Sequence, residues 1–252
     1  MPMDVSQIAA LLQPYLAGLT LPPGIYGQLD TYLDLLLRWN AKINLTAIRE
    51  PEAIVTRHFG ESLFTAGALF GDRGCPTPGA PSNPSFGLGG LEDAQSNPGA
   101  PSNPSLGLGG IRDAQSTCTT LADLGSGAGF PGLPIKLAFA ELHVTLIESQ
   151  NKKATFLREV IRALGLQHVE VYNGRAEHWG RQADVVTLRA VEKFERILPA
   201  AAELVAPRGR LCLLVGGSFD PSTLHLAAMD WQAPINLPAS EGRKLLVGRR
   251  AE

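Results

Sequence analysis

Cysteine is scarce in this chain of 252 residues, and its placement excludes two common ways of stabilising a fold. The three cysteines are Cys75, Cys118 and Cys212, and no two of them form a C-x-x-C pair. No His/Cys cluster has the spacing of a zinc site either. We therefore expect no disulfide bonds and no bound metal.

Long apolar runs and a basic leader are also missing. No run approaches the about 20 apolar residues that a transmembrane helix needs. The first residues, MPMDVSQ, contain Asp4 and no basic residue, unlike the start of a signal peptide. We therefore expect a cytoplasmic protein that makes no membrane contact, and we expect it to be a monomer.

An excess of basic charge is absent as well. The chain has 22 Lys and Arg residues against 24 Asp and Glu residues, a formal net charge of -2. This balance argues against a protein that is basic throughout, as many nucleic-acid-binding domains are. The 44% hydrophobic content suits a globular protein with a real core, and the length suits one α/β domain with an accessory segment.

The segment 72–118 differs from the rest of the chain. PGAPSNPSFGLGGLEDAQS (78–96) recurs as PGAPSNPSLGLGGIRDAQS (98–116), with 16 of 19 positions identical. Two short units rich in glycine and proline cannot bury a core, so we expect a disordered insertion and not a solenoid. It divides the chain into a helical extension (1–71), the insertion (72–118) and an α/β domain (119–252).

The central motif is LADLGSGAGFPG (121–132), an apolar strand that ends in an acid, a glycine-rich turn and the start of a helix. Glycines are needed where a backbone turns sharply after a strand and a ligand must approach closely. Asp123, Gly125, Gly127 and Gly129 follow the pattern acid-x-G-x-G-x-G, which resembles the first motif of S-adenosylmethionine (SAM) methyltransferases.

Two other interpretations of this motif exist. Gly127, Gly129 and Gly132 fit the G-x-G-x-x-G spacing of dinucleotide-binding folds. A glycine turn that binds nothing is the second. We favour SAM because Gly125, directly after the strand, has no role in the dinucleotide pattern. Pro131 also crowds the turn where an uninterrupted helix would lie against a pyrophosphate.

Beyond the motif, strands and helices alternate. This pattern predicts a mostly parallel, doubly wound sheet that binds its ligands at the carboxyl ends of the strands. The expected strands are 121–124, 143–147, 168–172, 183–188, 209–215 and 244–247, with helices over 131–139, 151–164 and 194–204.

Three strand ends carry candidate cofactor residues. Glu148 follows the second strand, where an acid can accept hydrogen bonds from a ribose, although it can also be a solvated acid. Ala176 and Glu177 follow the third strand, where an adenine would lie, and Glu177 is equally a candidate surface charge. Arg189 ends the fourth strand, where it can hold the cofactor carboxylate, a base edge or a phosphate. A structural ion pair is the alternative for Arg189.

The N-terminal region reads as a small helical subdomain, with helices over 4–19, 22–40 and from Pro51 onward. Its polar side gathers five basic or titratable residues, with Trp39 nearby: Arg38, Lys42, Arg49, Arg57 and His58. A solvated basic face is one interpretation. A surface that contacts RNA phosphates, with an aromatic ring available for stacking, is the other.

Motifs that the sequence lacks exclude several kinds of methyl acceptor. The Asp/Asn-Pro-Pro-aromatic motif that accompanies transfer to an exocyclic amine is absent after the fourth strand. Cys212 lies inside an apolar strand, where a buried inert thiol is expected in place of a nucleophile. An acceptor that is already nucleophilic remains, and N7 of guanine fits because it has no proton to remove. Such an enzyme has to position its two reactants and needs little acid–base catalysis, so we assign no catalytic residue. Arg189 is the one candidate for such a role.

With these residues in view, the sequence resembles the RsmG/GidB family of bacterial 16S rRNA guanine-N7 methyltransferases. Four blocks carry the resemblance: LLLRWNAKINLTAIREPEAIVTRHFGESL, LADLGSGAGFPGLPIKLA, HVTLIESQNKKATFLREV and DVVTLRAV. The resemblance covers nearly everything outside 72–118. The family usually has Asp where this chain has Glu61, and Lys-Gly where it has Gly216-Gly217 after Val215.

The resemblance implies a Rossmann-like class I fold with a seven-stranded sheet and an N-terminal helical extension. It implies SAM contacts at Gly125, Phe130, Ala176, Glu177 and Arg189. It also implies methylation of one guanine of 16S rRNA, within the small ribosomal subunit. Two alternatives stay open: a nicotinamide-dependent oxidoreductase, and a SAM-binding ribosome-associated factor without catalytic activity, suggested by the missing lysine and the neutral charge.

Overall fold

The fold is seen in a computed structural model that describes residues 3–71, 119–189, 194–217, 219, 224, 226 and 229–252, without the side chains of 194–196. The expected insertion at 72–118 lies outside the described residues. The helices are α1 (Val5–Leu16), α2 (Ile25–Asn40), α3 (Pro51–Ile54), the π-helical turn η1 (Val55–Gly60), α4 (Glu61–Phe70), α5 (Gly132–Ala138), α6 (Asn151–Ala163), the 3-10 turn η2 (Ala176–His178) and α7 (Phe194–Glu203).

One sheet organises the described residues. Its strands are β1 (Thr120–Leu124), β2 (His143–Ile147), β3 (Val169–Tyr172), β4 (Ala183–Arg189), β5 (Val205–Val215), β6 (Met229–Trp231), β7 (Ile235–Asn236) and β8 (Lys244–Arg250). The order is β3-β2-β1-β4-β5-β8-β6, and β7 pairs with β8. Strands β1 to β5 are parallel, whereas β8 runs antiparallel to β5 and β6. The mostly parallel α/β fold is confirmed, with an eighth strand, β7, beyond the expected seven.

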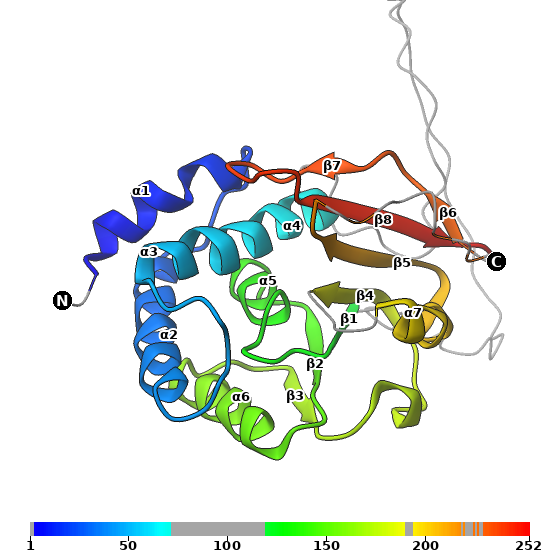
Figure 1. The fold of residues 1–252 in the computed structure, drawn as a ribbon, viewed down its shortest axis with the longest axis horizontal. Coiled ribbons are helices and arrows are strands. Elements are labelled where there is room, and N and C mark those ends of the chain that lie inside the picture. The colour runs from blue at the N-terminus through cyan, green and yellow to red at the C-terminus, as the bar shows by residue number, and fades with distance from the viewer. Residues whose placement is uncertain are drawn as a thin grey trace, which may run out of the picture. The chain divides into compact units, whose positions relative to one another are not determined.

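Alternating side chains divide the core between the two faces of the sheet. Leu121 and Val144 belong to the cluster that packs on the N-terminal helices and on α5 and α6. The second cluster contains Ala122 of β1 and Ile147 of β2, together with residues of α7 and η2. These two side chains are an odd number of positions from Leu121 and Val144, so they point to the opposite face. Figure 1 shows α1 to α6 gathered on one side of the sheet and α7 on the other. The helical extension therefore covers the same face as the helix that follows the glycine loop.

The third N-terminal helix differs from the uniform helix that the sequence predicted. It begins at Pro51 as expected, passes through the π-helical turn η1 and continues as α4. Gly60 is the last residue of η1 and packs against the ring of Tyr15. A Cβ at this position would lie 2.7 Å from Cδ2 of Tyr15, so there is no room for a larger side chain. The closely packed turn brings His58 and Glu61 toward the carboxyl ends of the strands.

Candidate active site

Strand register places the predicted cofactor residues side by side. Leu124 of β1 pairs with Ile147 of β2 on one side and with Leu188 of β4 on the other. The residues that follow these strands, including Glu148 and Arg189, therefore flank the glycine loop. Between β1 and β4 the chain order reverses, which is where doubly wound sheets bind their ligands.

The glycine loop needs glycine for different reasons at different positions. Gly125, Gly127 and Gly129 all have left-handed backbones, with φ of 66°, 57° and 91°. Open space surrounds Gly127, because a Cβ there would meet only the Gly125 carbonyl, at 3.7 Å. A Cβ on Gly129 would collide with the Tyr32 hydroxyl and lie 2.5 Å from Cδ1 of Leu133. Gly127 thus faces free space that a ligand can use, whereas Gly129 faces packed protein.

Asp123 stabilises the glycine loop through hydrogen bonds. This fully buried carboxylate accepts a hydrogen bond from the Thr187 hydroxyl at 2.8 Å and another from the backbone N–H of Gly132 at 3.2 Å. Burial raises the pKa of Asp123 to about 6, against the opposing effect of these hydrogen bonds. The acid of the motif therefore serves the loop and the first turn of α5 and does not face a ligand.

Glu148 also binds the loop. Its Oε2 accepts a hydrogen bond from the Gly127 N–H at 2.9 Å, and its Oε1 accepts one from the Gln150 N–H at 2.8 Å. The residue is only 5% exposed. A carboxylate has about four acceptor sites, so two remain for a ribose. Further along this edge, Ala176 is buried in η2 and Glu177 is exposed.

Arg189 forms a buried ion pair with the helical extension. Its Nη2 donates to Oε2 of Glu61 at 2.7 Å and to the Arg57 carbonyl at 2.5 Å. Glu61 is 1% exposed, and its other oxygen accepts from Nε of Arg243 at 2.6 Å. Nη1 of Arg189 is buried and has no hydrogen-bond partner among the described residues. Arg189 is therefore fixed by an ion pair and still has a free donor group.

His58 stacks on the glycine loop. Its ring lies 4.6 Å from that of Phe130 at an interplanar angle of 12°, and its Nε2 is 2.8 Å from the Thr46 hydroxyl. Burial, reinforced by the charges of Arg189 and Arg57, lowers the pKa of His58 to about 3. His58 is consequently neutral, unlike the exposed side chains with which the sequence grouped it. Those four are Arg38, Lys42, Arg49 and Arg57.

Sequence reasoning missed the residues that support this site. Tyr32 of α2 was not singled out from the sequence, yet its buried hydroxyl donates to the Ala128 carbonyl in the loop. Asn40 accepts hydrogen bonds from the N–H groups of Leu45 and Thr46 and so shapes the segment that holds His58. Nothing in the sequence indicated that Arg243 pairs with Glu61, because the two residues are far apart along the chain. The one clue to this support in the sequence was Glu61, an acid in a mostly apolar helix.

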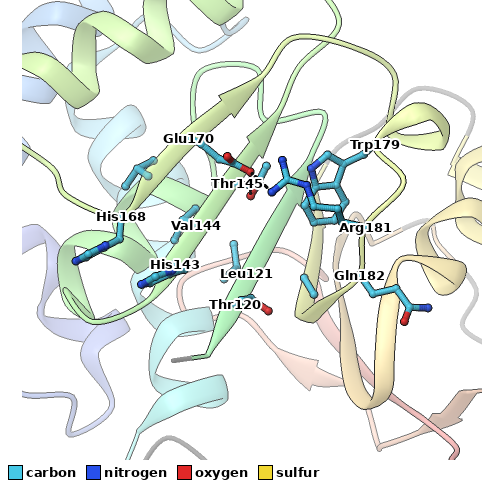
Figure 2. A pocket seen from close by; sticks show the side chains of 12 residues that line it. Thr120, Leu121, His143, Val144, Thr145, His168, Glu170, Trp179, Arg181 and Gln182 are labelled. Atoms are coloured by element: carbon cyan, nitrogen blue, oxygen red, sulfur yellow. Dashed lines mark hydrogen bonds and ion pairs between the residues drawn. The ribbon is translucent and has the colours of Figure 1, made fainter. Parts of the chain in front are cut away.

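The cavity shown in Figure 2 is separate from the candidate active site. It has a volume of about 380 Å³ and lies at the amino ends of β1 to β4, lined by residues such as Thr120, His143 and Trp179. None of the predicted site residues lines it. Because doubly wound sheets bind ligands at the opposite ends of their strands, this cavity is not the candidate active site.

Two further sequence predictions concern chemistry and membranes. Cys212 is fully buried in β5, and burial raises the pKa of its thiol to about 12, which confirms the inert thiol. In the described part of the chain, no helix is both long enough and apolar enough to span a membrane.

Comparison with known proteins decides between the classes that share this fold. The family model of GidB, rRNA small subunit methyltransferase G, matches residues 25–74 and 108–232. The chain belongs to this family. Ribosomal RNA small subunit methyltransferase G of Chloroflexus aggregans is 34% identical over 246 residues, covering 91% of this chain and 84% of the relative. The Stenotrophomonas maltophilia protein of the same name is 32% identical over 249 residues, covering 96% and 94%.

Membership of the GidB family confirms the resemblance and the enzyme class. The chain is a methyltransferase of small-subunit rRNA, and the oxidoreductase alternative is set aside. The family's methyl donor is SAM, and the site fits it: Gly127 faces open space, Glu148 has free acceptor sites and Arg189 has a free donor. The match begins at α2 and includes η1, so the helices from α2 to α4 lie within the family model.

Proposed function

We propose that this protein transfers the methyl group of SAM to N7 of one guanine in 16S rRNA. The observation that carries the choice of N7 is that two groups that could activate another acceptor atom, the Cys212 thiol and the Asp123 carboxylate, are both fully buried in the protein. Cys212 is buried with its pKa raised to about 12, and Asp123 is enclosed by Thr187 and Gly132. Guanine N7 attacks through an in-plane lone pair, so no residue has to remove a proton.

Each predicted cofactor residue has a role in this proposal. The loop residues Gly125, Gly127 and Gly129 let the ligand approach the backbone, and Phe130 closes the turn beneath it. Glu148 would accept the ribose hydroxyls, and Ala176 and Glu177 would flank the adenine. Arg189 would donate to the carboxylate. When bound, SAM supplies an electrophilic methyl group on its sulfonium, and the protein contributes orientation of the two reactants.

The RNA-binding face in this proposal consists of the exposed Arg38, Lys42, Arg49 and Arg57. Arg38 and Lys42 lie at the end of α2, beside Trp39, whose indole N–H donates to Glu159 of α6 at 3.1 Å. Exposed cations of this kind contact phosphates and position an RNA without reading its sequence. We further propose that the protein acts as a cytoplasmic monomer on the small ribosomal subunit.

Chemical cleavage of the RNA product tests the N7 assignment. N7-methylation leaves guanine prone to borohydride reduction and subsequent chain scission with aniline. Small subunits incubated with protein and SAM should give rRNA with a single new scission. Methylated rRNA that resists this treatment would place the methyl group on another atom.

A further inference from the structure

We propose that His58 contacts the acceptor base itself, donating a hydrogen bond from Nδ1 to O6 of the guanine. This inference rests on the proposed function and deepens it, because it names the residue that selects guanine over adenine. In the sequence, His58 is one of several cationic candidates for phosphate contact. The structure separates it from them.

The His58 ring carries an unsatisfied polar atom. Nδ1 of His58 is buried and has no hydrogen-bond partner among the described residues, and the same holds for Nη1 of Arg189. Buried polar groups in folded proteins are almost always paired, so these two atoms need a partner that the described residues do not supply, and a bound ligand is such a partner. Arg189 donates to the carbonyl of Arg57, the residue before His58, so the two orphans belong to one neighbourhood.

The hydrogen bonds around the His58 ring determine which of its nitrogens carries the proton. The backbone N–H of Ile48 donates to the Thr46 hydroxyl oxygen at 3.1 Å, which leaves the Thr46 proton free to donate to Nε2 of His58. That arrangement favours the neutral tautomer with hydrogen on Nδ1. The lowered pKa, about 3, agrees with a ring that stays neutral and donates through one nitrogen only.

The His58 ring lies directly beside the cofactor loop. His58 stacks on Phe130, which directly follows Gly129 of the cofactor loop, and Phe130 is nearly parallel to Tyr32 as well, at 13°. Tyr32 and Phe130 are themselves buried, so this stack fixes the orientation of the His58 ring beside the cofactor loop. The His58 ring is held from two sides, by Thr46 and by Phe130, so its free nitrogen has a fixed direction.

Donors from His58 and Arg189 would discriminate between purines. Guanine presents the acceptors O6 and N7 on its reacting edge, whereas adenine presents the N6 amino donor where guanine has O6. A donor from His58 Nδ1 therefore pairs with guanine and opposes adenine, while leaving N7 free for the methyl group. Nη1 of Arg189 has two N–H groups, so a contact with the cofactor carboxylate leaves one for the same O6.

Two substitutions at one position test the inference. His58→Gln places a polar atom near the former Nε2 and keeps the Thr46 contact, but it removes Nδ1. His58→Asn places a polar atom near the former Nδ1 and gives up the Thr46 contact. The measurements are kcat/KM for small subunits, SAM affinity by calorimetry and the thermal midpoint of each variant.

We expect His58→Gln to lower kcat/KM about tenfold or more, with SAM affinity within about twofold of the parent, and His58→Asn to retain more activity. A purely structural role through Thr46 predicts the reverse order. The reverse order, equal losses or parental activity in both variants would overturn the inference. A parent protein that makes no 7-methylguanosine would instead contradict the proposed function.

Discussion

The hydroxyl of Tyr32 donates a hydrogen bond to the backbone carbonyl of Ala128, across 96 positions of sequence, and so ties helix α2 to the glycine loop. Tyr32→Phe removes this bond and leaves the ring in place. We expect the variant to lose about 1–2 kcal/mol of unfolding free energy in urea titrations and to bind SAM more weakly. Tyr26→Phe, on the same helix and half-buried, is the matched control. Parental SAM affinity in Tyr32→Phe would show that the loop does not depend on α2.

Two glycines of the loop should respond differently to alanine. Gly127→Ala introduces a Cβ into open space, so only the left-handed backbone opposes it, at about 1–2 kcal/mol. We expect a folded protein that has lost most of its SAM affinity. Gly129→Ala drives a Cβ into Tyr32 and Leu133 and should lower the thermal midpoint more strongly. SAM titration and thermal unfolding of both variants check this. Normal SAM binding by Gly127→Ala would refute the open position as part of the cofactor site.

The exposed basic residues at the end of α2 should affect RNA binding alone. Arg38→Ala combined with Lys42→Ala should weaken subunit binding and lower the slope of log affinity against log salt by about 1 to 2. SAM affinity should not change, since neither residue touches the loop. Arg208→Ala combined with Arg249→Ala, exposed at the opposite strand ends, controls for general loss of charge. If the two pairs behaved alike, the basic face of α2 would be merely solvated.

His58 gives the fold a defined sensitivity to acid. Its pKa is about 3 in the folded protein and about 6.5 when unfolded, because burial disfavours the charged ring. Between these values the unfolded chain binds a proton that the folded chain does not. The stability contributed by neutral His58 is thus complete above about pH 6.5 and lost as pH falls toward 3.

Urea unfolding at two pH values measures this effect. On lowering pH from 7 to 5, the parent should lose about 1–2 kcal/mol more than His58→Gln, which has no group to titrate at this position. An equal loss in the two proteins would mean that His58 is not held in its neutral form.

Local patterns predicted most of the helices and strands, whereas the residues that support the site are brought together by long-range contacts. Strand β2 begins and ends where its apolar run does, and helix α2 ends at Asn40 as expected. Strands β6 and β7 were missed because three and two residues are too few to show alternation. The π-helical turn η1 was missed because it depends on the packing of Gly60 against Tyr15. No local signal could connect Glu61 with Arg243, which lie 182 positions apart.

Methyl transfer from labelled SAM to small ribosomal subunits that lack this modification tests the proposed activity. The product nucleosides are separated and identified by mass spectrometry, with Gly127→Ala protein as the inactive control. We expect label in 7-methylguanosine, about one methyl group per subunit, and no label with the control. Label in another nucleoside, or SAM binding without any transfer, would contradict it.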